Sequence, residues 1–294
     1  MRLGFHVSIA GGFDRCVERA IIRRCTTLQM FTAAPVQWAR NDIGTDEAAR
    51  FADELARLDI RPHFVHAKYL LNVSSPDLEL RAKSVADLCA ELQAARTLRA
   101  AGVILHLGSV GAEGTIAEGI DRVARALDTA CECSPEGPPV VLENSAGQGN
   151  IVGARFAEIA RIIAATNCPE RARVCIDTAH AFGAGYPLHE EDGLERALDE
   201  MDATFGLERL ALLHVNDSLL PLASGRDRHW HIGRGEIGRE AMARIVNHPA
   251  LLHLPFIMET PGTQADDLSN MRRIRRLIRP EHRPHLPPVP AALR

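Results

Sequence analysis

The chain has 294 residues, 46% of them hydrophobic, and a formal net charge of −4. Its length is close to the roughly 250 residues of a single α/β barrel, so we expect one large domain. No apolar run reaches about 18 residues and no secretion signal is evident, which predicts a cytoplasmic protein with no membrane partner. The seven cysteines contain no CxxC spacing and predict reduced thiols rather than a disulfide framework.

Short apolar runs alternate with longer amphipathic stretches along the chain. Eight runs, starting near residues 3, 27, 62, 102, 139, 173, 210 and 255, are predicted as strands. Helices are predicted between them, for example over 46–58, 78–99, 117–129 and 154–165, because apolar positions recur every three or four residues. Strands that are apolar on both faces indicate a buried parallel sheet, and eight strand–helix units predict its closure into a (β/α)8 TIM barrel.

The predicted barrel domain covers residues 1–280, followed by a Pro/Arg-rich C-terminal extension at 281–294. The composition of the extension is unsuited to a packed core. A doubly wound open sheet is the alternative fold.

Residues that commonly bind metals end six consecutive predicted strands. They are His66, His106, Glu143, Asp177, His214 and Glu259, and His180 follows three residues after Asp177. The C-terminal ends of barrel strands gather at one rim, so these side chains are expected to meet there. Carboxylates and imidazoles crowded at such a rim need divalent cations to offset their repulsion and desolvation. The pattern therefore predicts a metal centre at the C-terminal face of the strands.

The loop after the seventh predicted strand adds two further ligand candidates. Asp227 and His229 are two residues apart, a spacing that places both side chains on one side of an extended segment. Mixed imidazole and carboxylate ligands suit zinc, with manganese or iron as alternatives, and the lack of cysteine argues against a purely structural zinc site. His231 forms an HxH pair with His229 and is a weaker candidate.

Five motifs follow one another in a specific order: "ENSAGQG" at 143, "CIDTAHAFGAGYP" at 175, "HVNDS" at 214, "DRHWHIG" at 227 and "METP" at 258. Together with "FHVSIAGG" at 5 they extend over nearly the whole chain. In these motifs the sequence resembles the endonuclease IV family, the zinc-dependent apurinic/apyrimidinic endonucleases of base excision repair. The resemblance implies three zinc ions per chain. They would be held by His66, His106 and Glu143; by Glu143, Asp177, His214 and Glu259; and by His180, Asp227 and His229.

The activity implied by the resemblance is hydrolysis of the phosphodiester 5′ to an abasic site in duplex DNA, leaving a 3′ hydroxyl and a 5′ deoxyribose phosphate. Metal ions that share a carboxylate can activate a water and neutralise charge on the phosphate. Glu143 and Glu259 are the predicted catalytic residues, since either could orient the attacking water. A 3′-end-cleaning phosphatase or phosphodiesterase activity could accompany the reaction. Three divalent ions would change the formal charge from −4 to about +2, so the acidic composition is compatible with DNA binding.

DNA contacts are expected from four residues beside the ligands. By resemblance, Tyr69 and Leu70 in "HAKYLLN" insert into the duplex as the abasic nucleotide turns outward. Arg226 and Arg228 are predicted phosphate contacts. Loop packing and simple solvation are the respective alternatives. The basic run 272–279 is interpreted first as a helix face and second as a DNA contact.

Four positions depart from the family pattern without touching a ligand. Val36 replaces a usual arginine, and Lys68, where proline is common, could supply the lost DNA contact. Leu107 replaces a usual proline and Arg234 a frequent glutamate. The departures bear on lesion affinity and substrate range.

Two other functions stay open at the level of sequence. A divalent-metal sugar isomerase or epimerase with a xylose-isomerase-like barrel would use one or two ions and would not require a third. A non-catalytic barrel could keep the fold as a binding module. No obligate protein partner is evident, so a monomer is predicted.

Overall fold

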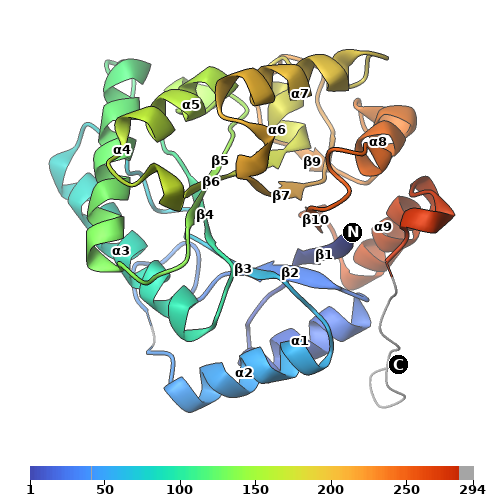
Figure 1. Cartoon of the computed structure of the whole chain (residues 1–294), viewed down its shortest axis with the longest axis horizontal. Helices are drawn as coiled ribbons and strands as arrows, with labels where there is room; N and C mark the ends of the chain where they lie inside the picture. The colour runs from blue at the N-terminus through green and yellow to red at the C-terminus, as the bar shows by residue number, and fades with distance from the viewer. Residues whose placement is uncertain (41, 285–294) are drawn as a thin grey trace.

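The computed structural model describes residues 1–40 and 42–284. Eight parallel strands form a closed barrel in the order β1, β10, β7, β6, β5, β4, β3, β2. Their bounds are β1 Arg2–His6, β2 Thr27–Met30, β3 His63–His66, β4 Val103–His106, β5 Val140–Glu143, β6 Ala172–Asp177, β7 Leu210–His214 and β10 Pro255–Met258. The predicted TIM barrel is confirmed (Figure 1), and the pairing of β1 with β10 rules out an open sheet because it joins the two edges.

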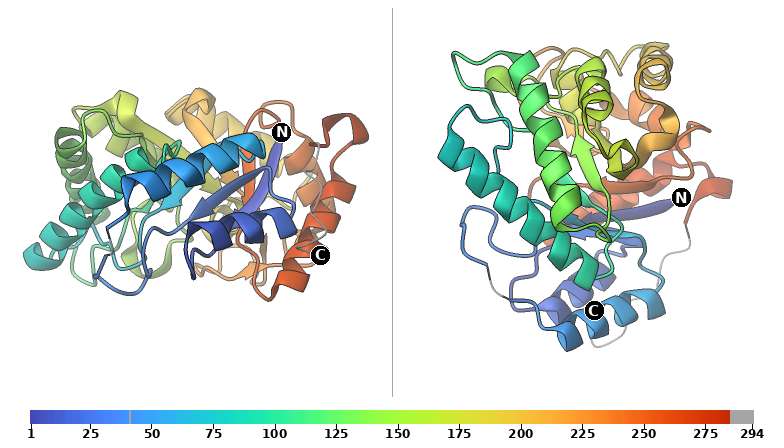
Figure 2. Two further views of the ribbon diagram at one scale, coloured as in Figure 1. Left: turned by 90° about the horizontal axis from the view of Figure 1, so that it is seen from below. Right: turned by 60° about the vertical axis from the view of Figure 1, so that its left-hand side comes forward.

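Helices surround the barrel on its outer side (Figures 1 and 2). They are α1 Phe13–Ile22, α2 Thr45–Arg57, α3 Leu78–Thr97, α4 Ile116–Cys133, α5 Phe156–Ala165, α6 Thr178–Gly183, α7 Gly193–Thr204, α8 Gly238–Asn247 and α9 Gln264–Leu277. Four short 3-10 helices complete the described part: η1 Gln148–Asn150, η2 Pro169–Arg171, η3 Leu207–Arg209 and η4 Pro280–His282. No helix among the described residues has the length and apolar character needed to cross a bilayer.

Local sequence explains the strands that carry the predicted ligands. Every residue of β5 is buried, from Val140 to Glu143, because the barrel interior lies on one side and the helices on the other. An apolar layer fills the interior beneath the strand ends; it consists of Phe64, Ile104, Val141, Cys175, Leu212 and Ile257. The polar residues that end the strands therefore lie directly above an apolar layer, where their charges are poorly screened.

A small hairpin above the barrel was not predicted from the sequence. It pairs β8 Asp217–Ser218 with β9 His229–Trp230 in antiparallel register. Buried Asp217 holds the loop that follows, since its carboxylate accepts hydrogen bonds from the amides of Gly235 and Ile237 at 2.9 and 3.0 Å. The hairpin fixes Asp227 and His229 near the ends of β6 and β7.

The cysteines differ from the prediction of reduced thiols. Disulfides join Cys89 of α3 to Cys133 of α4, and Cys131 of α4 to Cys168 before η2. Residues two apart on a helix point about 200° apart, so Cys131 and Cys133 face different neighbours. Spacing along the chain could not reveal either partner. The remaining three, Cys16, Cys25 and Cys175, are free and buried.

The barrel ends with α9 at Leu277, and η4 at Pro280–His282 follows it. Of the extension predicted at 281–294, residues 285–294 lie outside the described residues.

Candidate metal centre

The fold brings eight of the nine predicted ligands into three groups at one mouth of the barrel, and the ninth, Asp227, lies next to the third group. Within each group, one ligand atom per residue lies within 4.8 Å of the others. The first group is His66, His106 and Glu143; the second is Glu143, Asp177, His214 and Glu259; the third is Asp177, His180 and His229. Each group offers enough donors for a metal ion, and two carboxylates are shared between groups.

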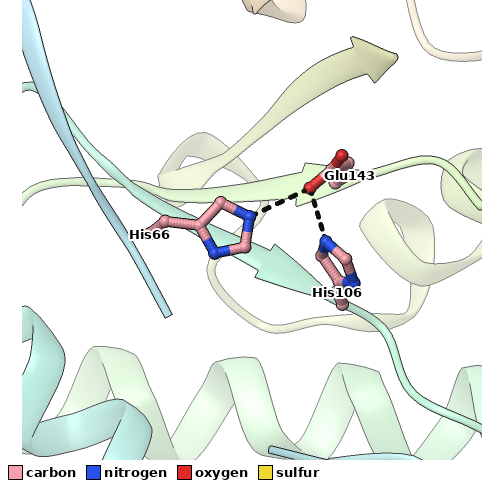
Figure 3. A group of neighbouring side chains, drawn as sticks. All are labelled: His66, His106 and Glu143. Atoms are coloured by element: carbon pink, nitrogen blue, oxygen red, sulfur yellow. Dashed lines mark ion pairs between the residues drawn. The ribbon is translucent and has the colours of Figure 1, made fainter. Parts of the chain in front are cut away.

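Three adjacent strands form the first group (Figure 3). His66 Nε2 lies 3.4 Å and His106 Nε2 3.0 Å from the same oxygen of Glu143, Oε2. Glu143 is 1% exposed and His66 is equally buried, whereas 38% of the His106 side chain is exposed. The group is therefore closed below and open towards solvent at His106.

The second group gathers three carboxylates around one imidazole. His214 Nδ1 lies 2.9 Å from Glu143 Oε1, 3.3 Å from Glu259 Oε2 and 3.8 Å from Asp177 Oδ2. Glu143 thus faces the first group with Oε2 and the second with Oε1. A carboxylate in this position can bridge two cations.

The third group lies where α6 starts and the β8–β9 hairpin folds back. His229 Nε2 lies 3.3 Å from Asp177 Oδ2. Asp227 approaches both histidines from the loop, with Oδ2 at 3.2 Å from His180 Nε2 and Oδ1 at 3.1 Å from His229 Nε2. Asp177 thus belongs to two groups, which the assignment from sequence did not include.

Outer hydrogen bonds fix which nitrogen of three histidines can bind a metal. His66 Nδ1 donates to the carbonyl of Ala67 at 2.7 Å, and His180 Nδ1 to the carbonyl of Asn144 at 2.9 Å. His214 Nε2 donates to Gln29 Oε1 at 2.6 Å. These oxygens can only accept, so in neutral rings the opposite nitrogens present lone pairs to the carboxylates.

The buried atoms of the centre fit divalent cations. His66 Nε2, Glu143 Oε2 and His229 Nε2 have no hydrogen-bond partner although they are buried. In the described part of the chain, no lysine or arginine forms an ion pair with Glu143, Asp177, Asp227 or Glu259. Lone pairs and carboxylate oxygens that face one another without a proton or cation between them repel. Nitrogen and oxygen donors of this kind suit zinc, manganese or iron.

The electrostatics of the metal-free chain are consistent with this deficit of positive charge. Burial alone would lower the pKa of His180, but Asp177, Asp227 and Glu143 raise it to about 10. Burial alone would likewise lower the pKa of His229, but Asp177 and Asp227 raise it to about 9. Burial would raise the pKa of Asp177, yet the neighbouring histidines lower it to about 2. The surrounding carboxylates thus favour positive charge at His180 and His229.

Two supporting residues were missed in the sequence. Gln29 Nε2 donates to Glu259 Oε1 at 2.6 Å, and His6 Nδ1 lies 3.3 Å from the same oxygen. His6 ends β1 just as the ligands end their strands, so the same reasoning extended to the first strand would have found it. Gln29 is a fully buried polar residue inside β2.

The residues predicted to contact DNA lie around this mouth. Tyr69 is 55% exposed, and its ring centroid lies 5.8 Å from those of both His66 and His106. Leu70 beside it is partly buried, and Arg226 and Arg228 are exposed on the loop that carries Asp227. One Arg228 nitrogen, Nη1, donates to the carbonyl of Asp227 at 2.7 Å.

The departures from the family pattern have different surroundings. Val36 is 68% exposed and Arg234 is exposed, whereas Leu107 is buried. The suggestion that Lys68 could supply a DNA contact is wrong, because its side chain is buried and its ammonium donates to Asp87 Oδ1 at 3.0 Å. His231 belongs to none of the three groups; its Nδ1 lies 3.1 Å from Asn270 Nδ2.

A cavity of about 730 Å³ opens near the first group of predicted ligands. Its lining includes His6 and Phe31, whose rings lie 5.8 and 5.3 Å from the ring of His66. The cavity provides room for a ligand beside His66.

Comparisons with known proteins agree with this architecture. A family model described as xylose isomerase-like TIM barrel matches residues 25–280. The "Probable endonuclease 4" of Halothermothrix orenii is 41% identical over 267 residues, which cover 91% of this chain and 96% of that protein. The crystal structure of endonuclease IV from Thermus thermophilus superposes with a TM-score of 0.82 at 35% identity, covering 94% of this chain and 98% of the other. A D-tagatose 3-epimerase-like protein reaches a TM-score of 0.70 at 16% identity, over 94% of this chain and 97% of the other, a likeness of fold alone.

Proposed function

Since the chain belongs to the endonuclease IV family, metal-dependent hydrolases of the deoxyribonuclease IV type with a role in DNA repair, we propose its reaction in detail. It hydrolyses the phosphodiester 5′ to an abasic site in duplex DNA and leaves a 3′ hydroxyl and a 5′ deoxyribose phosphate. It uses three zinc ions per chain, with manganese or iron as alternatives at individual positions.

The observation that carries this proposal is the double orientation of Glu143. Its Oε2 faces His66 and His106, and its Oε1 faces His214 at 2.9 Å. The proposed ligand sets are His66, His106 and Glu143; Glu143, Asp177, His214 and Glu259; and His180, Asp227 and His229. Asp177 Oδ2, 3.3 Å from His229 Nε2, joins the second set to the third.

The chain's own residues then have distinct roles. When bound, the divalent ions supply an activated water and neutralise charge on the phosphate oxygens. Glu143 and Glu259 orient the attacking water from the ends of β5 and β10. Gln29 holds both Glu259 and His214 through its side-chain amide, at 2.6 Å each, which keeps the ligands in place without metal-dependent rearrangement.

Recognition of the lesion is assigned to residues at the rim. Tyr69 and Leu70 enter the duplex where the base is missing, because an absent base lowers the energy needed to turn the nucleotide outward. The cavity beside His6 and Phe31, about 730 Å³, can receive part of the displaced strand. Arg226 and Arg228 contact phosphates next to Asp227.

The remaining parts of the proposal concern accompanying properties. The same centre removes phosphate or phosphodiester groups from 3′ ends, since both reactions attack phosphorus beside a 3′ oxygen. The enzyme acts as a monomer without an obligate protein partner, in the cytoplasm.

A nicking assay tests the main reaction. The substrate is a duplex that carries one tetrahydrofuran abasic analogue, and the control is the same duplex without it. We expect incision 5′ to the analogue, its loss on chelation and its return when zinc is restored. Incision at undamaged positions, or activity that survives complete chelation, would contradict the proposal.

Metal counting separates the proposal from a sugar isomerase or epimerase. We expect about three ions per chain by elemental analysis of protein saturated with zinc, whereas the isomerase alternative needs one or two. If only one or two ions bind and the protein converts a ketose, the isomerase function would replace the nuclease function as the explanation.

A further inference from the structure

A second cavity, of about 240 Å³, is lined by four arginines and lies between the loop after β9 and helices α8 and α9. The loop after β9 contributes Arg234, the start of α8 contributes Arg239, and α9 contributes Arg273 and Arg276; Ile232, Gly233 and Leu277 complete the lining. Helices α8 and α9 are neighbours on the side of the barrel where β10 pairs with β1 (Figure 1). We call this cavity the arginine pocket.

The charge of the arginine pocket is not balanced by the protein. None of its four guanidinium groups forms an ion pair with a carboxylate of residues 1–40 or 42–284. The nearby Asp266 offsets part of the charge of Arg273 but forms no ion pair with it; its Oδ2 accepts from the amide and the hydroxyl of Thr263 at 2.8 Å each. Burial, and then the charge of Arg234, lower the pKa of Arg273. Four cations this close together favour an anionic ligand.

Local contacts restrain two of the four arginines, Arg239 near its backbone and Arg273 at its guanidinium group. Gly233 has φ +68°, and a Cβ there would come within 3.3 Å of Cα and Cβ of Arg239, so the loop packs tightly on the start of α8. Arg273 Nη1 donates to Asn270 Oδ1 at 3.2 Å. Side chains fixed in this way lose less conformational entropy when they bind.

Asn270 also connects the arginine pocket to the metal centre. This fully buried residue donates to Thr260 Oγ1 at 2.8 Å and lies 3.1 Å from His231 Nδ1. Thr260 follows Glu259, and His231 is two residues from His229. Arg234 is five residues after His229, a span of at most about 17 Å in Cα position. One DNA strand rises about 3.4 Å per nucleotide, so this span corresponds to about five nucleotides.

We propose that the arginine pocket binds a backbone phosphate of the DNA substrate within about five nucleotides of the incised bond. Guanidinium groups suit this ligand because their donors match phosphate oxygens in pairs. The pocket extends the DNA footprint beyond Tyr69, Leu70, Arg226 and Arg228. The proposal rests on the proposed function, because it requires that DNA reaches the metal centre. Free inorganic phosphate shares the chemistry and is distinguished by the test.

The experiment compares two double variants of the metal-loaded full chain. Arg234→Ala with Arg276→Ala removes two charges from the arginine pocket. Arg125→Ala with Arg161→Ala removes two exposed arginines from α4 and α5, on another side of the barrel (Figure 1), neither of which forms an ion pair within the described chain. Affinity for a tetrahydrofuran duplex with about ten base pairs on each side is measured over a range of salt concentrations.

For the arginine-pocket variant we expect the slope of log affinity against log salt to fall by about one, because one phosphate contact is lost. Affinity at low salt should fall by about tenfold or more, while incision at saturating DNA stays within about twofold, because no reacting group changes. The control variant should keep the wild-type slope. Shortening each arm of the duplex in turn, down to about one base pair, should abolish the difference once the phosphate bound by the pocket is missing.

Equal slopes for the two double variants would overturn the proposal. It would also be overturned if the arginine-pocket variant lost binding of inorganic phosphate, measured by calorimetry, yet kept the wild-type DNA slope. Failure of the proposed function has a different signature, because wild-type protein would then neither prefer nor incise the tetrahydrofuran duplex.

Discussion

Two clusters of buried charge lie within this barrel, and they are completed in different ways. In the first cluster two acidic residues of α3 are paired with cations. Lys68 Nζ lies 3.0 Å from Asp87 Oδ1, and Arg40 Nη1 lies 2.7 Å from Glu91 Oε1. Thr32 Oγ1 donates to the other oxygen of Glu91 at 2.6 Å. Two cations thus face two anions, and the chain itself satisfies them. We call these residues the ion-pair network.

The metal centre contains the same kind of buried carboxylate without the matching cations. Glu143 is 1% exposed and Glu91 0%, yet all ion-pair partners of Glu143 in the described part of the chain are histidines. Its Oε2 lacks a hydrogen-bond partner. Burial of a charged residue therefore does not by itself indicate a functional site. What distinguishes the metal centre is charge that the protein leaves unbalanced.

The sharpest test of this comparison is the same substitution at both glutamates. Glu143→Gln should reduce incision of the tetrahydrofuran duplex by at least about 10³-fold, since one neutral amide cannot bridge two cations. Bound zinc should fall below three ions per chain. Near-normal activity together with full metal content would show that Glu143 does not bridge.

Glu91→Gln should instead affect stability. Removing one anion from the ion-pair network leaves the partly buried Arg40 with only the longer contact to Asp87, at 3.3 Å, and should lower the free energy of unfolding by about 2 kcal/mol in urea denaturation. The folded fraction should keep its zinc and its activity per folded molecule. Loss of metal in this variant would mean that the two clusters are coupled.

Removal of metal should make stability depend on pH in a characteristic direction. The pKa values of His180 and His229 in the metal-free chain, about 10 and about 9, lie above the ordinary value of 6.5. Their protonation therefore stabilises the fold fully below pH 6.5, and this contribution is lost as pH rises through 9 and 10. The Tm of chelated protein should fall between pH 7 and pH 10, in calorimetry at several pH values.

Metal-loaded protein provides the control. Cations then occupy the histidine nitrogens, so the decline should be absent, and zinc binding near pH 7 should release protons that a pH-stat detects. Parallel declines with and without metal would place the titration outside the metal centre.

The smallest effect is expected from replacing a balanced pair as a whole. Lys68→Met alone should destabilise by about 3 kcal/mol, because Asp87 is left buried without its ammonium partner. Adding Asp87→Leu should restore most of that loss, to within about 1.5 kcal/mol of wild type in urea denaturation, since paired apolar replacements often cost little. A double variant as unstable as the single one would indicate that Arg40 depends on Asp87 more than the 3.3 Å contact suggests.

The sequence alone was sufficient to predict the strands and to propose the ligands. All eight predicted strands are present within a few residues, because a parallel sheet covered by helices requires short apolar runs at regular intervals. Six of the nine ligand candidates were recognisable because polar residues ended those runs. His6 followed the same rule, although the first strand was not considered.

The contacts of each polar residue became apparent only from the tertiary structure. Chain spacing gave no sign that Lys68 is buried against Asp87, that Asp177 serves two groups, or that Cys131 and Cys133 pair with different partners. Nor did it bring Arg234 and Arg276 to one pocket. Strand formation depends on local periodicity, whereas charge balance depends on neighbours that are distant in sequence. These become neighbours only when the barrel closes and its loops pack together.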